Sequence, residues 1–538
     1  MEKRFLLGNE AVALGALDAG VGASYAYPGT PSTEITEFIL GSRASQSGKV
    51  HCRWTANEKT ALEAALGASY AGRRAMATMK HVGLNVASDA FVNAAVAGPN
   101  AGLVVVVADD PSMHSSQNEQ DSRLYTDLAL VPCLEPSDQQ EAYDMPRAAF
   151  DLSERHGVPV LVRLTTRLAH SRADITPRPA TDPACREAAS DRRRYVLLPV
   201  NARGNYERLV SAQAALEAAS ETSPFNRLID GADRRLGIVA CGLAVNYVLE
   251  AFDGSCPHPL LKISQYPIPS AQVERLLTSC DRVLVVEEGY PYVEGKLRGV
   301  PPRATPRILG RQSGEIPRTG ELTPQAVRAA VGMPQREAVH VPSTIPVPRP
   351  PALCSGCPHA DGFRALSEAM AAHGGAGRVF SDIGCYTLGA LPPYDAIDTC
   401  IDMGASITMA RGAADAGLTP AVAVIGDSTF VHSGMTGLLD CVADATPVTV
   451  VLLDNSTVAM TGGQPSLATD RLVSICRGLG VDTDHLRTLD LHPTHHAENV
   501  RAIAEELSHP GPSVIIGRRE CIQTARRRAA HASDKEAS

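Results

Sequence analysis

Short apolar runs recur between helical stretches, and they constrain the fold of this chain more than any other feature. In the first third of the sequence the runs lie at residues 23–27, 75–79, 102–108 and 158–164. The stretches between them have the periodicity or the alanine content of helices, at 9–20, 58–72 and 87–97. Strands that are apolar on both faces and alternate with helices are typical of a parallel sheet covered on both sides. We therefore predict an α/β fold with doubly wound parallel sheets.

Two segments with the composition of linkers divide the chain. Residues 171–195 are rich in Pro, Asp and Arg, and residues 341–351 contain five prolines, which favours an extended conformation. We predict two larger α/β domains at residues 1–175 and 353–521, and a smaller domain between them at 196–335. A polar tail is predicted at 522–538. Strands are predicted at 236–240 and 282–287 in the middle domain, and at 421–425 and 448–453 in the third.

Composition and charge exclude several classes of protein. The 59 acidic and 50 basic residues give a net charge of −9, and only 4% of residues are aromatic, with Trp54 the single tryptophan, so we expect no nucleic-acid partner. No apolar stretch approaches the roughly 20 residues of a membrane helix, and the N-terminus lacks the apolar core of a signal peptide. We expect a cytoplasmic protein that does not bind membranes, whose thirteen cysteines form no disulfide framework.

Two predicted strands of the third domain end in oxygen-bearing side chains. The strand at 421–425 runs into Asp427, and the strand at 448–453 runs into Asn455. The interval between them accommodates strand, helix and strand, so both side chains should emerge at the carboxyl edge of the sheet, where open α/β sheets bind ligands. A carboxylate and an amide oxygen suit Mg²⁺ that bridges a diphosphate. The same pair could also be ordinary turn residues of an α/β domain.

This spacing is that of the thiamine diphosphate motif, although Ser428 stands in place of its usual second glycine and Asp454 precedes Asn455. A Thr-Gly-Gly-Gln loop follows at 461–464, and its glycines would let the backbone approach a phosphate. Thiamine chemistry also needs a glutamate that hydrogen-bonds N1′ of the aminopyrimidine. Glu58, which opens the helix at 58–72, is the candidate, although a glutamate at a helix start is commonly a surface residue that complements the helix dipole.

Four cysteines form a candidate metal or cluster site. Cys354 and Cys357 are a C-x-x-C pair, Cys385 lies in a glycine-flanked turn, and Cys521 follows an apolar run at 513–517. Four thiolates would satisfy a [4Fe–4S] cluster, and thiolates with or without His359 would equally satisfy a structural zinc ion. The residues alone leave both possibilities open, and we predict that the other nine cysteines are buried thiols.

With these residues in place, the chain resembles the α subunits of the indolepyruvate ferredoxin oxidoreductases, within the thiamine-dependent 2-oxoacid:ferredoxin oxidoreductases. The resemblance covers nearly the whole chain, through the segments YPGTPSTE, MKHVGLNVASD, ADDPSMHSSQNEQDSR, CSGCPH, DIGCYTLG, GDSTFVHSG and LDNSTVAMTGGQ. It implies a thiamine diphosphate-binding fold. Residues 1–175 would be the pyrimidine-type domain, 353–521 the diphosphate-type domain, and 196–335 a smaller domain like the C-terminal domain of transketolase.

The resemblance also implies residue roles. Glu58 is similar to the glutamate that activates the pyrimidine, and Thr30 to the threonine that holds the oxoacid carboxylate. The implied Mg²⁺ ligands are Asp427, Asn455 and a backbone carbonyl near Thr457, and the implied [4Fe–4S] ligands are Cys354, Cys357, Cys385 and Cys521. Further cofactor contacts are expected at Gly384, Cys385, Met403, Gly404, Gly426, Ser428, Thr461 and Gly462, and substrate-pocket residues without assigned roles at Lys80, His81 and Arg123.

The activity implied is oxidative decarboxylation of an aryl-2-oxoacid such as indolepyruvate, with coenzyme A as co-substrate. Electrons would leave through one cluster to ferredoxin or another acceptor, and a smaller β subunit would complete an αβ or (αβ)₂ enzyme. The ferredoxin-type cysteine runs of relatives are missing after Cys521, so the acceptor is open. The alternatives are a non-oxidative thiamine-dependent decarboxylase or carboligase, and a non-catalytic subunit with zinc bound by the cysteines.

Overall fold

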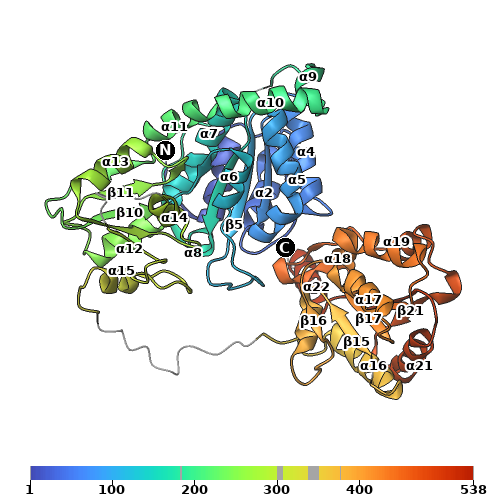
Figure 1. Cartoon of the computed structure of the whole chain (residues 1–538). Helices are drawn as coiled ribbons and strands as arrows, with labels where there is room; N and C mark the ends of the chain where they lie inside the picture. The colour runs from blue at the N-terminus through green and yellow to red at the C-terminus, as the bar shows by residue number, and fades with distance from the viewer. Residues whose placement is uncertain (1, 182–184, 300–306, 337–350, 376, 537–538) are drawn as a thin grey trace. The chain divides into compact units, whose positions relative to one another are not determined.

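A computed structural model describes residues 2–181, 185–299, 307–336, 351–375 and 377–536 of the chain. The chain divides into two compact units, Met1–Val339 and His340–Ser538, and each is described by itself (Figure 1). The predicted proline-rich linker at 341–351 lies, except for its last residue, outside the described residues. In the described ranges, no helix has both the length and the apolar character needed to cross a bilayer.

The larger sheet of the first unit has seven strands in the order β12-β6-β7-β5-β4-β2-β3, parallel except for the edge strand β12. Its strands are β2 (Ala23–Ala26), β3 (His51–Trp54), β4 (Ala75–Lys80), β5 (Leu103–Asp109), β6 (Cys133–Leu134), β7 (Val160–Thr165) and β12 (Gln265–Tyr266). The four apolar runs predicted in this region are strands of this sheet. Their apolar character on both faces is explained by helices that cover both sides.

Alternate residues of β5 show the two covered faces. Val104 and Val106 face one core, with the helices α1 (Gly8–Asp18), α2 (Thr33–Gly41) and α7 (Gln139–His156). Val105 and Val107 face the other, with α4 (Glu58–Tyr70) and α5 (His81–Ala97). Burial of each such side chain contributes about 1.5–3 kcal/mol, so the doubly wound arrangement is favoured by every strand residue.

A second sheet in the same unit has five strands in the order β14-β13-β10-β11-β9, with only β9 antiparallel. Its strands are β9 (Arg227–Ile229), β10 (Gly237–Cys241), β11 (Leu260–Ile263), β13 (Arg282–Val286) and β14 (Arg307–Leu309). The segment after β11 continues into β12, which pairs with β6 of the larger sheet. The predicted first and middle domains thus lie in one compact unit, and the boundary between them remains a prediction.

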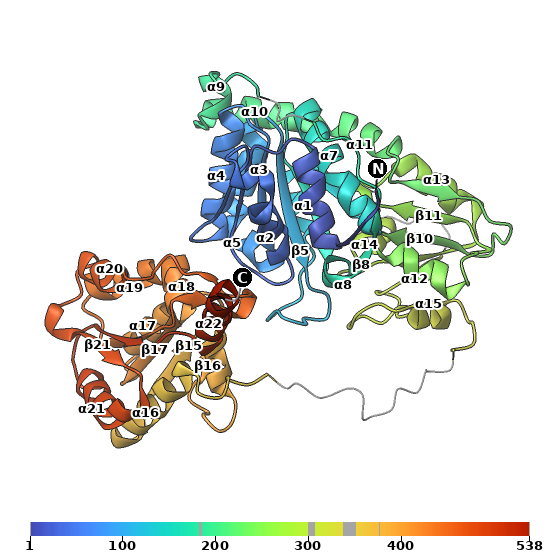
Figure 2. The same cartoon turned by 180° about the vertical axis from the view of Figure 1, so that it is seen from behind.

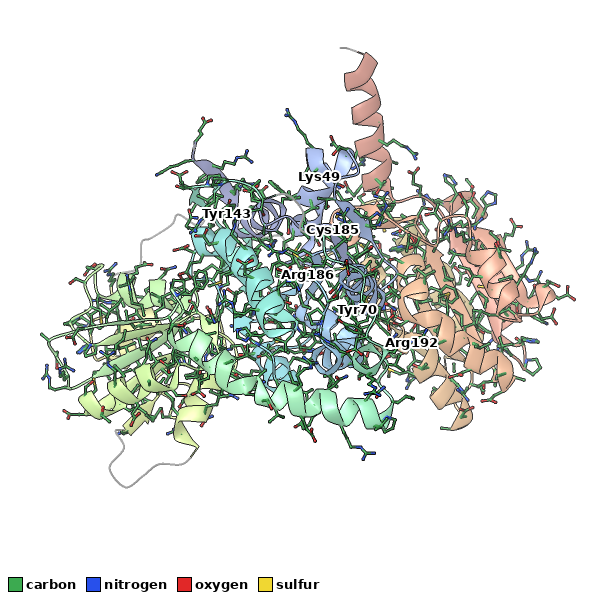
Figure 3. All side chains as sticks on the ribbon, turned by 90° about the horizontal axis from the view of Figure 1, so that it is seen from above. Lys49, Tyr70, Tyr143, Cys185, Arg186 and Arg192 are labelled. Carbon is green, nitrogen blue, oxygen red and sulfur yellow. The ribbon has the colours of Figure 1, made fainter. Side chains whose placement is uncertain are left out.

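The segment predicted as a linker at 171–195 packs against the first unit. Its start forms β8 (Arg172–Ile175), antiparallel to β1 (Arg4–Leu7). Further along, the Arg186 amide donates to the Gly72 carbonyl at 2.8 Å and the Ala189 amide donates to the Tyr70 carbonyl at 2.7 Å. Figure 3 shows Tyr70, Cys185 and Arg186 near one another on this unit. Backbone hydrogen bonds therefore hold the described parts of this polar segment against the surface of the first unit.

The second unit contains a fully parallel six-stranded sheet in the order β16-β15-β17-β18-β22-β21. Its strands are β15 (Arg378–Ser381), β16 (Thr399–Cys400), β17 (Ala421–Gly426), β18 (Val448–Asp454), β21 (Leu486–Asp490) and β22 (Ser513–Arg518). The helices α16 (Pro358–Ala372) and α21 (His496–Leu507) cover one face. The other is covered by α17 (Ala405–Asp415) and α19 (Met435–Ala443), as Figure 2 shows from behind. The predicted polar tail forms the helix α22 (Ile522–Glu536).

Candidate functional site

Asp427 lies where the sequence predicted it, at the carboxyl edge of the second unit's sheet. The parallel register places Gly426 opposite Leu453, so Asp427, directly after β17, lies beside Asp454, the last residue of β18. Asp427 is only 3% exposed, and its Oδ2 atom has no hydrogen-bond partner among the described residues. Burial, reinforced by the Asp454 carboxylate, raises the pKa of Asp427 to about 7, although a hydrogen bond with Ser466 opposes the shift. The nearby Arg518 pairs with Asp454 at 3.1 Å and leaves Oδ2 of Asp427 open.

Asn455 is the second predicted oxygen ligand, and hydrogen bonds hold it on three sides. Its Oδ1 accepts from the Thr457 amide at 3.1 Å, and its Nδ2 lies 3.3 Å from Nε2 of His359. Its backbone carbonyl accepts from the Cys521 amide at 3.2 Å. An amide oxygen has two lone pairs, so Oδ1 retains one for a ligand. With the open oxygen of Asp427, this donor set fits Mg²⁺.

The predicted loop at 461–464 returns the chain to this edge. Thr457 begins β19 (Thr457–Val458), which pairs with β20 (Gln464–Pro465), and the Thr457 hydroxyl donates to the Gln464 carbonyl at 3.1 Å. Thr461 and Gly462 lie in the turn that joins the two short strands, where the Thr461 hydroxyl donates to the Val458 carbonyl at 3.3 Å. The loop is therefore anchored next to Asn455 by its own pairing.

The four predicted ligand cysteines share one neighbourhood of the second unit. Cys357 caps α16 and Cys385 begins a 3-10 turn, Cys385–Ala390. Burial, followed by the charges of Cys357, Cys521 and Cys354, raises the pKa of the Cys385 thiol to about 12. Across the described ranges, no three His, Cys, Asp or Glu side chains lie close enough to hold a single metal ion. The thiols are therefore near one another but not drawn in around one ion.

Asp382 is a site residue that the sequence reasoning missed. It follows β15 directly, and its carboxylate accepts from the Gly404 amide at 3.1 Å, the Ser406 hydroxyl at 2.7 Å and the Tyr386 hydroxyl. Burial raises its pKa to about 6. Asp382 thus ties the turn that carries Cys385 to the predicted loop of Met403 and Gly404. An acid at a strand end was the available signal, because the same pattern identified Asp427.

Glycines give this edge its close packing. Gly404 has a φ of +97°, and a Cβ there would fall 2.7 Å from Cβ of Ser433, so only glycine fits. Gly384 and Gly426 both pack against the ring of Tyr386. Ser428, directly after Asp427, is half-buried. The structure therefore gathers the cofactor-contact residues predicted in the second unit along one sheet edge and its adjoining loops.

Glu58 belongs to the first unit, and the structure buries it. It opens α4 after Asn57, whose side chain accepts from the Thr60 amide at 2.9 Å and caps the helix. Glu58 is only 5% exposed and lies against Gly83 of α5, where a Cβ would come within 2.6 Å of its Oε1. This burial is not that of a surface acid that merely complements the helix dipole, so it favours the functional interpretation of Glu58.

Thr30 and Glu58 are connected through Lys80, which lies at the end of β4. The Lys80 side chain packs against Gly29, and its Nζ donates to the Ser115 carbonyl at 2.7 Å. The Ser115 hydroxyl in turn donates to the Thr30 carbonyl at 3.2 Å. Burial lowers the pKa of Lys80 to about 8, and the charges of Asp110 and Glu58 oppose this shift. Both catalytic residues predicted in the first unit therefore lie near Lys80.

The other two predicted substrate-pocket residues are also buried. His81 begins α5, and its Nε2 lies 3.2 Å from the Asn118 carbonyl. Arg123 is fully buried, donates from Nε to Asp121 at 2.9 Å, and pairs with Glu287 at 3.0 Å. Since Glu287 belongs to the segment of the five-stranded sheet, Arg123 joins the two sheets of the unit. Its charge is already paired within the unit, and its place in a substrate pocket stays a prediction.

Comparisons with known proteins agree with this geometry. The family described as "Pyruvate flavodoxin/ferredoxin oxidoreductase, thiamine diP-bdg" matches residues 14–210. "Thiamine pyrophosphate enzyme, C-terminal TPP binding domain" matches residues 382–516. Each unit therefore contains a match to a thiamine diphosphate-binding domain.

Full-length relatives carry the family assignment. The indolepyruvate oxidoreductase subunit IorA of Archaeoglobus fulgidus is 39% identical over an alignment of 572 positions, which covers 98% of this chain and 88% of the relative. The IorA subunit of Methanothermobacter thermautotrophicus is 39% identical, with 97% and 87% covered. The chain belongs to the IorA family of thiamine diphosphate-dependent 2-oxoacid:ferredoxin oxidoreductases, which confirms the resemblance seen in the sequence.

A solved structure confirms the predicted fold class. The 2-oxoglutarate:ferredoxin oxidoreductase from Magnetococcus marinus superposes with a TM-score of 0.50 over 61% of this chain and 65% of its own, at 18% identity. At this identity the likeness concerns the fold alone.

Proposed function

We propose that this chain is the catalytic subunit for oxidative decarboxylation of aryl-2-oxoacids of the indolepyruvate type. The bond between the carboxylate and the oxo carbon breaks and releases CO₂, and the acyl carbon forms a bond with the sulfur of coenzyme A. Two electrons pass one at a time to ferredoxin or another one-electron acceptor, and the thiol proton is released. Relatives named indolepyruvate oxidoreductase support the substrate class, and coenzyme A is bound to the solved 2-oxoglutarate enzyme.

The observation that carries this proposal is the buried Asp427 carboxylate, which has an open oxygen and follows β17, the strand that pairs with β18 before Asn455. Thiamine diphosphate, when bound, supplies a carbanion at C2 and an electron sink for decarboxylation. Asp427, Asn455 and a backbone carbonyl near Thr457 would hold the Mg²⁺ that binds the diphosphate. Glu58 would hold a proton at N1′ of the pyrimidine, and Thr30 would orient the substrate carboxylate.

We assign a [4Fe–4S] cluster to Cys354, Cys357, Cys385 and Cys521. Four thiolates are the ligand set that such a cluster needs. The four thiols lie near enough to influence one another's charge. Membership of a 2-oxoacid:ferredoxin oxidoreductase family favours the cluster over zinc.

The remaining assignments follow from the same proposal. Residues 1–175 would hold the pyrimidine and 353–521 the diphosphate, and 196–335 would correspond to the transketolase C-terminal domain. All thirteen cysteines are free thiols, which supports a reducing, cytoplasmic setting. Relatives are named as subunits, which supports a smaller β subunit in an αβ or (αβ)₂ enzyme.

Product analysis tests the activity. Anaerobically purified enzyme with its partner subunit is supplied with indolepyruvate, coenzyme A, Mg²⁺, thiamine diphosphate and an electron-accepting dye. Acyl-CoA formation with stoichiometric dye reduction is expected, together with iron and sulfide near four per chain. Aldehyde without dye reduction would instead establish the non-oxidative decarboxylase or carboligase, and a colourless, zinc-containing protein would establish the non-catalytic alternative.

Two variants test the residue roles. Glu58→Gln should lower turnover at least about 100-fold, because the amide cannot exchange the proton at N1′, while the protein still folds. Asp427→Asn should abolish Mg²⁺-dependent binding of thiamine diphosphate in calorimetry. Near-normal turnover in the first variant, or unchanged cofactor affinity in the second, would contradict these assignments.

A further inference from the structure

His359 is a buried residue of the second unit that the proposed mechanism does not use. It lies two residues after Cys357, in the first turn of α16, and is only 3% exposed. Its ring contacts Tyr386 edge-on, with 6.1 Å between ring centroids. Its Nε2 is 3.3 Å from Nδ2 of Asn455, which is 96 residues further along the chain. The side chain therefore links the cysteine segment to the strand end that carries Asn455.

The hydrogen-bond network defines which atom donates in this contact. The Thr457 amide donates to Asn455 at 3.1 Å, so the atom that receives it must be the Asn455 oxygen. The other side-chain atom of Asn455 is then the NH₂ group, a donor that faces His359. His359 Nε2 therefore accepts, and the ring proton of the neutral imidazole is on Nδ1. In the described part of the chain, Nδ1 has no hydrogen-bond partner although it is buried.

The unpaired Nδ1 atom favours a functional role for His359 over a purely structural one. A buried N–H without an acceptor has lost its hydrogen bonds to water and gained none in the protein, so it destabilises the fold. A residue that only fills space would be better replaced by an apolar side chain, which carries no such penalty. What the imidazole offers instead is an acceptor, at the right reach, for the Asn455 amide.

Asn455 is also held from its backbone side. Its carbonyl accepts from the Cys521 amide at 3.2 Å. One cysteine segment thus holds the Asn455 side chain through His359, and another holds its backbone. The segments that carry Cys357 and Cys521 and the end of β18 form one hydrogen-bonded assembly around Asn455.

We propose that His359 is a positioning residue for the cofactor site. Its Nε2 fixes the plane of the Asn455 amide, so that Oδ1 presents its remaining lone pair to the cation, and it ties the Cys354–Cys357 segment to that site. The inference rests on the proposed function, in which Asn455 binds Mg²⁺. Outer partners that orient a metal ligand typically contribute about 10–100-fold to metal affinity.

Two polar substitutions of His359 test whether an acceptor must reach the Asn455 amide. In His359→Gln, the side-chain oxygen occupies the place of Nε2 and can accept from Asn455, whereas in His359→Asn the shorter amide cannot reach it. Calorimetric titration of the anaerobically purified chain with Mg²⁺, at saturating thiamine diphosphate, measures the affinity. We expect His359→Gln to bind within about 3-fold of the wild type and His359→Asn to bind about 10–100-fold more weakly, with equal iron content in both.

A double-mutant cycle with Asn455→Ala provides the second readout. If His359 acts through Asn455, His359→Asn should not weaken Mg²⁺ binding further once Asn455 is truncated. Equal affinities of the Gln and Asn variants, or additive losses in the cycle, would overturn the inference while leaving the proposed function intact. Failure of the proposed function is distinguishable, because the wild type itself would then show no Mg²⁺-dependent binding of thiamine diphosphate.

A third variant, His359→Leu, tests the structural alternative directly. We expect its unfolding midpoint in urea, without cofactor, to stay close to that of the wild type, because removal of the unpaired N–H offsets the loss of the acceptor for Asn455 Nδ2. Its Mg²⁺ affinity should fall as in His359→Asn. A large loss of stability with unchanged Mg²⁺ affinity would show that His359 serves the packing of α16 and would contradict the positioning role.

Discussion

Both units bury charged side chains, but the buried arginines of the first unit and Asp427 of the second differ in how their charges are compensated. In the first unit Arg123 and Arg163 are fully buried, and each faces carboxylates: Asp121 and Glu287 for Arg123, and Asp109 at 2.6 Å for Arg163. In the second unit the buried Asp427 keeps an oxygen without a partner among the described residues. Burial of a charge is costly unless it is paired. The first arrangement pairs its charges internally, whereas the second leaves a carboxylate oxygen open, where the proposed Mg²⁺ would bind.

Paired and open buried charges have different consequences in this fold. A buried ionic network whose members satisfy one another holds sheets together, as Arg123 does between the two sheets of the first unit. Asp427, a buried carboxylate with an open oxygen, instead lies at the carboxyl edge of a parallel sheet, where open α/β sheets bind ligands. The variants below test this difference, because a paired charge and an open one should respond to substitution with opposite signs.

The largest effect is expected for Arg163→Met. Its guanidinium pairs with Asp109 at 2.6 Å and with Glu135, so its removal leaves buried carboxylates without a cation. We expect the free energy of unfolding to fall by about 3–5 kcal/mol. Urea denaturation followed by the fluorescence of Trp54, the single tryptophan, reports on the first unit. A loss below about 1 kcal/mol would break the comparison.

An exposed ion pair provides the matched control for this variant. Arg172 pairs with Glu10 at 3.2 Å, and its side chain is 45% exposed. Arg172→Met removes the same kind of group from a solvated pair, so we expect a loss of less than about 1 kcal/mol in the same measurement.

Lys80→Met tests a buried cation that is only partly compensated. Burial lowers the pKa of Lys80 to about 8, whereas an unfolded lysine titrates near about 10.4. Between these values the unfolded state binds the proton and the folded state does not, so this group raises stability as pH rises. At pH 7 both states are protonated, and the penalty to the wild type is at most about 3 kcal/mol.

We therefore expect Lys80→Met to unfold at higher urea than the wild type at pH 7, with the advantage shrinking as pH rises from 8 to 10. Taking the difference between the two proteins removes the titration of other groups, since both share them. Trp54 fluorescence again follows the first unit. A difference in stability that stays constant across this pH range would show that folding does not lower the pKa of Lys80.

Asp427→Asn should act in the opposite direction from Arg163→Met. The asparagine amide is neutral and can donate to Asp454, so the variant removes a buried open charge. We expect the cofactor-free chain to gain about 1–3 kcal/mol of stability at pH 8, measured by circular dichroism in urea. The stabilisation that Mg²⁺ and thiamine diphosphate give the wild type should disappear. Destabilisation of the cofactor-free variant would mean that Asp427 serves the fold.

The sequence could predict those site residues whose position follows from local pattern. Asp427 and Asn455 end two apolar runs, and neighbouring parallel strands bring their ends together whatever the rest of the chain does. Asp382 carried the same signal and was missed because its role depends on Gly404 and Ser406, across a loop. The pattern located the strand ends correctly, but it did not specify which side chains meet there.

Long-range contacts were beyond the reach of such reasoning. Burial of Glu58 depends on Gly83 in the next helix, and the role of Arg123 depends on Glu287 near the second sheet. Arg123 was expected at a substrate pocket only through the family resemblance, and the tertiary structure shows that it pairs with internal carboxylates. His359 and Asn455 are 96 residues apart in the sequence, and no local sequence pattern predicts their contact.

The smallest effect is expected for Lys59→Ala. This variant distinguishes the role of the buried Glu58 from that of the exposed charges beside it on α4. Lys59 pairs with Glu63 on the surface of α4, with about half of each side chain exposed. Such pairs contribute about 0.3–0.5 kcal/mol, and alanine restores part of this through its helix propensity. We expect a stability change below about 0.5 kcal/mol and unchanged turnover. Since Glu58→Gln changes the adjacent residue and should abolish turnover, a comparable loss in Lys59→Ala would mean that the charge of the helix surface controls activity, and the buried glutamate would lose its assigned role.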